Sequence, residues 1–216
     1  MLPPIPDKLL KIDDVTAAEH FSLDATDACF YVWEYAVRQG YTAGPTNQLI
    51  INLKIKPSVL AKTPTRKFYK EQAIDHAAKA LRNLLGQQTA EGQYSFVPVP
   101  SSKAIGDQDY DDRNAQVLQR AFSGWQFDVQ PILRVRRSMR ADHEGTDRMT
   151  HDELLALTEL LRPAQPLRAT IIVLDDVVNS GKHFKVAKSL LSAAYPTATI
   201  FGLFLARCIR ETEPEF

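Results

Sequence analysis

The sequence has little cysteine and no excess of charge of either sign. Its 216 residues contain only Cys29 and Cys208, which lie far apart in the chain, so neither a disulfide framework nor a four-cysteine zinc site is expected. The 26 lysines and arginines balance the 26 aspartates and glutamates. Net charge therefore does not indicate nucleic acid as a partner, although a local basic patch remains open.

Long apolar runs are also missing. No run approaches the length of a membrane-spanning helix, and the first residues, 1–6, have neither the basic start nor the long apolar centre of a secretion signal. The sequence thus predicts a cytoplasmic protein with no membrane partner. Hydrophobic residues make up 44% of the chain, which is enough for a sizeable core.

Strand and helix patterns alternate along most of the chain. The expected strands cover 49–55, 94–99, about 129–133, 169–174 and 198–205, and the expected helices cover 24–39, 70–85, about 111–122, about 150–162 and 183–194. This order predicts an α/β fold with a mostly parallel, twisted sheet flanked by helices. We expect an N-terminal extension of helical and strand segments (1–92), a compact core (93–210) and a tail (211–216). The first 70 residues carry no recognisable motif, and we expect them to form a hood over the site or a surface for a second copy or another protein.

Residues 171–181 are the most informative stretch. Four apolar residues, 171–174, precede Asp175 and Asp176, as in a buried parallel strand that ends in two carboxylates. The sequence Asn179-Ser180-Gly181 follows, just before an amphipathic helical segment, and free amides at a helix N-terminus bind phosphate. Adjacent carboxylates suit sugar hydroxyls or a hydrated Mg²⁺. The pattern predicts a sugar-phosphate ligand at the carboxyl edge of the sheet. The alternative is an ordinary strand whose following loop only caps a helix.

A P-loop is excluded for the same segment. That motif needs a glycine at position 176 and a serine or threonine at 183, where this chain has Asp176 and His183. A nucleoside triphosphatase of the P-loop type is therefore not expected.

A second polar loop follows the expected strand 94–99. The residues after Pro98-Val99-Pro100 are Ser101, Ser102 and Lys103, which offer hydroxyls and a positive charge to an anion. The alternative is a proline-rich turn that leads into a solvated loop.

Together these two segments resemble the motifs of the type I phosphoribosyltransferases, and the Pro-Val-Pro sequence is similar to that of the amidophosphoribosyltransferase-like and ComF-like members. The resemblance covers about residues 94–207. The family usually has hydroxyl residues where this chain has Asn179 and His183, and the cysteine cluster that often begins ComF-like proteins is absent.

The resemblance implies phosphoribosyl pyrophosphate (PRPP) as ligand and Mg²⁺ as cofactor. Asp175 and Asp176 would hold the ribose hydroxyls and, directly or through water or ligand, the Mg²⁺ ion, and Lys103 would complete the catalytic set. The implied substrate-binding residues are Val177, Val178, Asn179, Ser180, Gly181, Lys182 and His183 around the 5′-phosphate, together with Ser101, Ser102, Arg113 and Arg137.

The family also has a mobile loop that closes over the pyrophosphate, and the basic segment 134–140 with the polar stretch 141–152 occupies that part of the chain. Arg134, Arg137 and Arg148 are its candidates for the pyrophosphate, and the alternative is a solvated surface. His143 and His151 are too far apart in sequence for a helical zinc motif.

The function implied is transfer of a phosphoribosyl group with release of pyrophosphate. Three alternatives stay open: a noncatalytic regulator that binds PRPP or a nucleotide, a ComF-like accessory protein in DNA handling, and a structural module that has kept the fold alone.

Overall fold

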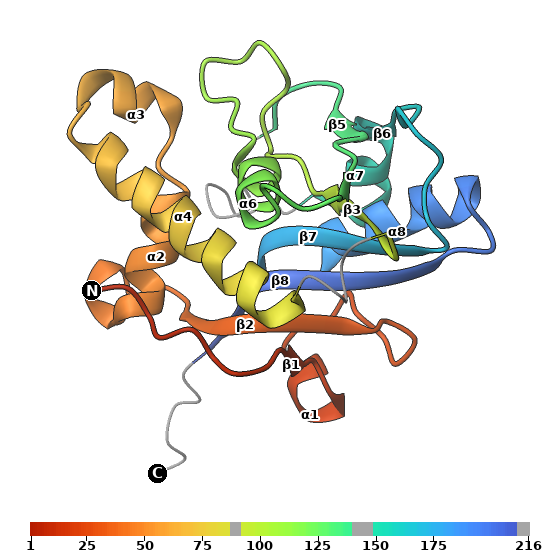
Figure 1. Cartoon of the computed structure of the whole chain (residues 1–216), viewed down its shortest axis with the longest axis horizontal. Helices are drawn as coiled ribbons and strands as arrows, with labels where there is room; N and C mark the ends of the chain where they lie inside the picture. Colours follow the sequence, from red (N-terminus) through yellow and green to blue (C-terminus); the bar gives the residue numbers. More distant parts are fainter. Residues whose placement is uncertain (87–91, 140–148, 211–216) are drawn as a thin grey trace.

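The computed structural model describes residues 1–86, 92–139 and 149–210, and these form an α/β structure (Figure 1). The large sheet has the strand order β1-β2-β8-β7-β3-β4 and is flanked by helices. Its strands are β1 (Leu10–Lys11), β2 (Cys29–Ala36), β3 (Tyr94–Pro98), β4 (Asp128–Val129), β7 (Thr170–Val178) and β8 (Thr199–Ile209). All neighbouring strands are parallel except the edge strand β1, so the sheet is mixed and mostly parallel.

The helices and a small ribbon complete the fold. The helices are α1 (Asp14–Ala17), the 3₁₀ turn η1 (Tyr41–Ala43), α2 (Pro45–Leu53), α3 (Pro57–Lys62), α4 (Arg66–Leu85), α6 (Arg113–Ala121), α7 (His151–Leu157) and α8 (Lys182–Ala194). The ribbon pairs β5 (Leu133–Val135) with β6 (Thr158–Leu160) in antiparallel orientation.

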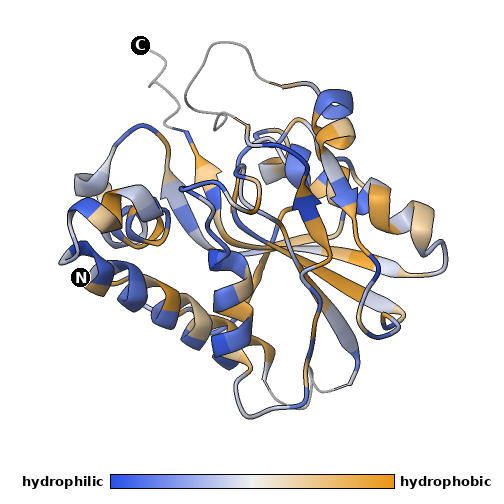
Figure 2. Ribbon diagram, turned by 90° about the horizontal axis from the view of Figure 1, so that it is seen from above, coloured by the Kyte–Doolittle hydropathy of each residue, from blue (hydrophilic) through white to orange (hydrophobic). Residues whose placement is uncertain are grey.

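The sheet is covered on both faces, as the continuous apolar run of β7 predicts. Ile172 and Leu174 pack into a core shared with α2, α4 and α6, while Ile171 and Val173 pack into a second core with α8. Figure 2 shows the hydrophobic strands enclosed by helices that turn a hydrophilic side outward. Because β7 is the strand between β8 and β3, its carboxyl end lies in the middle of the sheet edge.

The expected helix over 24–39 is wrong, because residues 29–36 form β2, which pairs with β8 along its length. Apolar residues in this segment also recur at helical intervals, and this spacing predicts a helix where the chain forms a strand. The sequence Phe30-Tyr31-Val32-Trp33 is rich in the aromatic and β-branched residues that favour strands, and pairing with β8 decides the structure.

The expected strand over 49–55 is also wrong, because most of it belongs to helix α2. Pro45 stands in the first turn, where proline is well tolerated. Leu49, Ile50 and Leu53 are fully buried, and their spacing forms one helical face against α4. The alternation of residues 49, 51, 53 and 55 fits a strand equally well, so local pattern could not decide.

The other expected elements are confirmed in type, with shifted ends. Two regions are more divided than expected: the strand near 129–133 is split into β4 and β5, and the helix near 150–162 ends at Leu157, where β6 follows. In the described parts of the chain, no helix is both long and apolar enough to cross a membrane.

Candidate functional site

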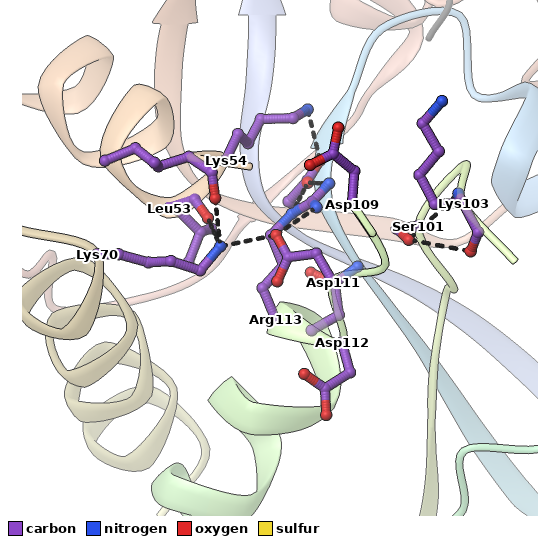
Figure 3. A network of polar contacts seen from close by, with 12 residues as sticks. Leu53, Lys54, Lys70, Ser101, Lys103, Asp109, Asp111, Asp112 and Arg113 are labelled. Atoms are coloured by element: carbon purple, nitrogen blue, oxygen red, sulfur yellow. Dashed lines mark hydrogen bonds and ion pairs between the residues drawn. The ribbon is translucent and has the colours of Figure 1, made fainter. Parts of the chain in front are cut away.

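The two predicted carboxylates lie near the carboxyl end of β7. Parallel pairing brings the loop after β3 to the same edge, and ion pairs join this edge to α6 and to the end of α2 (Figure 3). Residues that are more than a hundred positions apart in sequence therefore meet around Asp176.

Asp176 is buried and paired with two cations. Its Oδ2 accepts from Arg113 Nε at 2.7 Å and lies 2.5 Å from Nη2, while its Oδ1 accepts from Lys54 Nζ at 3.0 Å. Burial alone would raise the pKa of this carboxyl, but the charges of Arg113 and Lys54 outweigh burial and hold the pKa below its ordinary value. Asp176 is thus an ionised carboxylate whose oxygens both have partners.

Asp175 has a different environment. Its Oδ1 accepts from Asn114 Nδ2 at 3.2 Å and from the backbone amide of Asp176 at 2.8 Å. Burial, followed by the nearby charge of Asp176, raises the pKa of Asp175. Asn114 also donates to the Val99 carbonyl at 3.0 Å, and its own Oδ1 is buried without a hydrogen-bond partner in the described residues. The two neighbouring carboxyls therefore differ in two ways. The pKa is raised for Asp175 and lowered for Asp176, and the ion pairs of Asp176 use both of its oxygens whereas the hydrogen bonds of Asp175 to the described residues use only Oδ1.

A buried lysine on α4 extends the network. The Nζ of Lys70 donates to the carbonyls of Leu53 and Ile55 at 3.0 and 2.9 Å and to Asp111 Oδ2 at 2.7 Å. Asp111 in turn accepts from Arg113 Nη1 at 3.0 Å. Figure 3 shows these groups converging, with Asp112 turned away. Because the two carbonyls flank residue 54 in sequence, Lys70 fixes the backbone that carries Lys54.

The polar loop after β3, which contains Ser101, Ser102 and Lys103, lies beside this network (Figure 3). Ser101 bonds to the backbone of Lys103, whose Nζ donates to the Met139 carbonyl at 3.1 Å. The Met139 amide donates to the Ser102 carbonyl at 2.7 Å. The loop is therefore tied to the chain that follows β5. Arg113 is not part of this loop and instead faces Asp176.

The turn at 179–181 has the form of an anion site. Gly181 has φ of 87°, in the left-handed region, and stands immediately before α8. In the described part of the chain, the backbone amides of Asn179, Ser180 and Gly181 donate to no acceptor. Successive unpaired amides in such a turn form a concavity that favours a bound anion.

An N-terminal segment packs against the opposite, carbonyl side of this turn. The Asn179 carbonyl lies 2.5 Å from His20 Nδ1, and the Ser180 carbonyl accepts from the Ser22 amide at 2.9 Å. The side chain of Leu23 lies over Gly181. Since these hydrogen bonds use carbonyls, they leave the amides of the turn available.

The remaining predicted residues lie around these groups. Val177 and Val178 complete β7, and His183 stands in the first turn of α8. The side chain of Asn179 accepts a hydrogen bond from Arg210 at 3.2 Å. The side chain of Lys182 donates to the Met149 carbonyl. Arg134 pairs with Glu159 across the ribbon, and Arg137 is exposed with no ion pair to the described residues. Arg148, His143 and the tail 211–216 lie outside the described residues.

The described residues contain no cluster of three or more histidine, cysteine or acidic side chains arranged to hold a metal ion. This donor set does not form a protein cage for Mg²⁺. It does fit an ion bound mainly by ligand phosphates and water with one carboxylate, which is the usual way that Mg²⁺ is held at phosphate sites.

Sequence reasoning missed Lys54, Lys70 and His20. Lys70 gave one usable signal, because it falls on the apolar face of α4 marked by Ala73, Ile74 and Ala77. Lys54 and His20 gave none, since their partners lie 122 and 159 residues away.

Comparison of the sequence with models of known protein families and with curated proteins gave no match.

Proposed function

We propose that the protein binds PRPP or a related phosphoribosyl ligand and acts as a type I phosphoribosyltransferase-like enzyme, with Mg²⁺-dependent release of pyrophosphate. The observation that carries the proposal is the run of three unpaired amides at 179–181, which begins three residues after Asp176, just past the end of β7. A phosphate on these amides would set an attached sugar against the carboxylates.

Asp175 is the better placed first partner for a ribose hydroxyl, because its hydrogen bonds to the described residues use Oδ1 and leave Oδ2 open. Asp176 would need to release a cation before it could accept a hydroxyl. Lys54, with its side chain 37% exposed, is the partner that a ligand can displace, whereas Arg113 is 15% exposed and holds the carboxylate with two nitrogens.

The displaced Lys54 would then be free to face the negative charge of the ligand, together with Lys103. In the transfer step the bond between ribose C1 and pyrophosphate oxygen breaks, its electron pair leaves with pyrophosphate, and a lone pair of the acceptor forms the new bond to C1. Positive charge develops on the ring during this exchange, and the carboxylate of Asp176, once Lys54 has left it, would stabilise that charge. Bound Mg²⁺ would neutralise charge on the leaving group, with Asp175 or Asp176 as its protein ligand.

Calorimetric titration with PRPP and Mg²⁺ tests the binding step. We expect Asp175→Asn/Asp176→Asn to weaken binding at least about tenfold, since an ionic hydrogen bond contributes about 1.5–3 kcal/mol. Because this double variant could unfold, Lys103→Ala provides a second probe at a less buried position, and Lys79→Ala, an exposed lysine on α4, provides the matched control. Unchanged binding in a folded double variant, or no binding of the wild type at millimolar PRPP, would refute the site.

A noncatalytic regulator is the second candidate function. Two observations favour it: Asp176 is already paired with two cations, and the segment around His20 and Leu23 packs against the turn at 179–181. Such a protein would bind PRPP and change the contacts of its N-terminal segment without turnover.

Pyrophosphate release separates the two candidates. A transferase releases pyrophosphate from PRPP with at least one base or amine acceptor, and Asp176→Asn abolishes the release while the variant stays folded. A regulator binds PRPP with the same dependence on Asp175 but releases no pyrophosphate with any acceptor in the panel.

A further inference from the structure

We infer that residues 56–69, named here the α3–α4 corner, form a surface that binds single-stranded nucleic acid. The charge distribution is the first observation. Between residues 35 and 70 the sequence has seven lysines and arginines and no aspartate or glutamate. Because the whole chain is neutral (26 − 26 = 0), the rest of the sequence carries a formal charge of −7. Segment 35–70 therefore carries an excess of positive charge, whereas the rest of the chain carries an excess of negative charge.

The basic residues of the corner are held at the surface. Every residue from 61 to 69 is exposed, across the end of α3 and the start of α4, and Figure 1 shows these two ends meeting at an outer corner of the molecule. Among the described residues, no carboxylate forms an ion pair with Lys62, Arg66 or Lys67. Their charge is thus available to an external anion, unlike that of Lys54 and Lys70 in the same basic run.

Two aromatic rings lie among these cations. Phe68 is 62% exposed and Tyr69 is 50% exposed, although large aromatic side chains are usually buried to a greater degree. Their ring centroids are 5.6 Å apart at an interplanar angle of 73°. This edge-to-face arrangement leaves ring surface open to solvent, where a flat ligand could stack.

Exposed cations beside exposed aromatic rings suit a ligand that carries both negative charges and flat rings, and single-stranded nucleic acid is such a polyanion. Single strands present phosphates together with unpaired bases, and bases stack on aromatic side chains with little regard to sequence. A duplex keeps its bases stacked inside, and an acidic peptide has carboxylates but few flat rings. The α3–α4 corner therefore fits single-stranded DNA or RNA, and this inference does not depend on the proposed function of the sheet edge.

Fluorescence anisotropy with a labelled oligothymidylate of about 16 nucleotides tests the inference directly. We expect Phe68→Ala/Tyr69→Ala to weaken binding of the single strand by about fivefold or more, since each stacked base contributes about 1–3 kcal/mol. The matched control is Phe21→Ala, which removes another exposed aromatic ring and should leave binding unchanged.

Salt dependence tests the charges separately. For single strands the slope of log K against log salt is about −0.7 per phosphate contact, so Lys62→Ala/Arg66→Ala/Lys67→Ala should make the slope shallower by about 2. A control variant that loses three exposed lysines elsewhere, Lys8→Ala/Lys11→Ala/Lys79→Ala, should keep the wild-type slope.

Three outcomes would overturn the inference. They are no binding of the oligonucleotide at low salt, binding that both corner variants leave intact, and equal competition by polyglutamate or by a duplex of the same length. Calorimetry with PRPP on the same corner variants keeps the two proposals distinguishable, because the α3–α4 corner shares no residue with the turn at 179–181 or with the β7 carboxylates.

Discussion

Replacing Lys70 by methionine should cost a large part of the protein's stability. The lysine is 5% exposed, and its ammonium donates to two backbone carbonyls and to Asp111. Methionine has nearly the same length but donates nothing. The variant leaves the carbonyls of Leu53 and Ile55 without this donor and Asp111 with Arg113 as its remaining cation.

The magnitude follows from these contacts. Breaking a buried ion pair by removing one partner costs about 3–5 kcal/mol, and an unsatisfied buried carbonyl costs about 1–3 kcal/mol. These costs overlap, and relaxation or water entry recovers part of them, so we expect a loss of about 3–5 kcal/mol in the free energy of unfolding. Since small proteins are stable by about 5–15 kcal/mol, the loss would be plain in a urea titration.

Lys79→Met is the matched control, because Lys79 lies on the solvent side of the same helix and should change stability by no more than about 0.5 kcal/mol. A double-mutant cycle of Lys70→Met with Asp111→Asn should give a coupling of about 0.5–3 kcal/mol. If Lys70→Met costs less than about 1 kcal/mol, or if the cycle is additive, the contacts of Lys70 do not hold the end of α2 in place.

Three further predictions test the turn and the sheet. Burial lowers the pKa of His20 below its ordinary 6.5, so the unfolded chain takes up the proton first and stability falls as pH drops through 6.5; urea titrations on both sides of that pH should show a smaller fall for His20→Gln. Gly181→Ala places a Cβ 2.5 Å from the Leu23 side chain at a positive φ, so we expect a loss above about 1 kcal/mol, of which Leu23→Ala should recover the steric part in thermal melts. Gly202→Ala brings a Cβ to 2.7 Å from Cys29 Sγ, which should cost about 1–3 kcal/mol; a melting temperature equal to the wild type would contradict that contact.

The local sequence pattern is enough to predict an element where the pattern of apolar residues matches only one kind of burial. The run before Asp175 has apolar residues for both faces of the sheet, so β7 and the turn after it were predicted from neighbouring residues alone. The elements β2 and α2 were mistaken for each other's type, because each segment fits both periodicities and only its partner decides. The strand expected over 169–174 continues to Val178, so Asp175 and Asp176 lie inside β7 near its carboxyl end, and their partners were not predicted.

The partners of Asp176 change what the motif can do. Two adjacent acids in the sequence suggest two carboxylates that are both free to bind a ligand. In the folded chain, Arg113 at the start of α6 and Lys54 at the end of α2 form ion pairs with Asp176. The resting site then holds three cations, on Lys54, Lys70 and Arg113, against the carboxyls of Asp111, Asp175 and Asp176. Because burial and the charge of Asp176 raise the pKa of Asp175, Asp175 is the carboxyl of the β7 pair that takes up a proton first. A ligand that contacts Asp176 must displace Lys54, so its affinity should depend on the backbone that Lys70 holds as well as on the two acids.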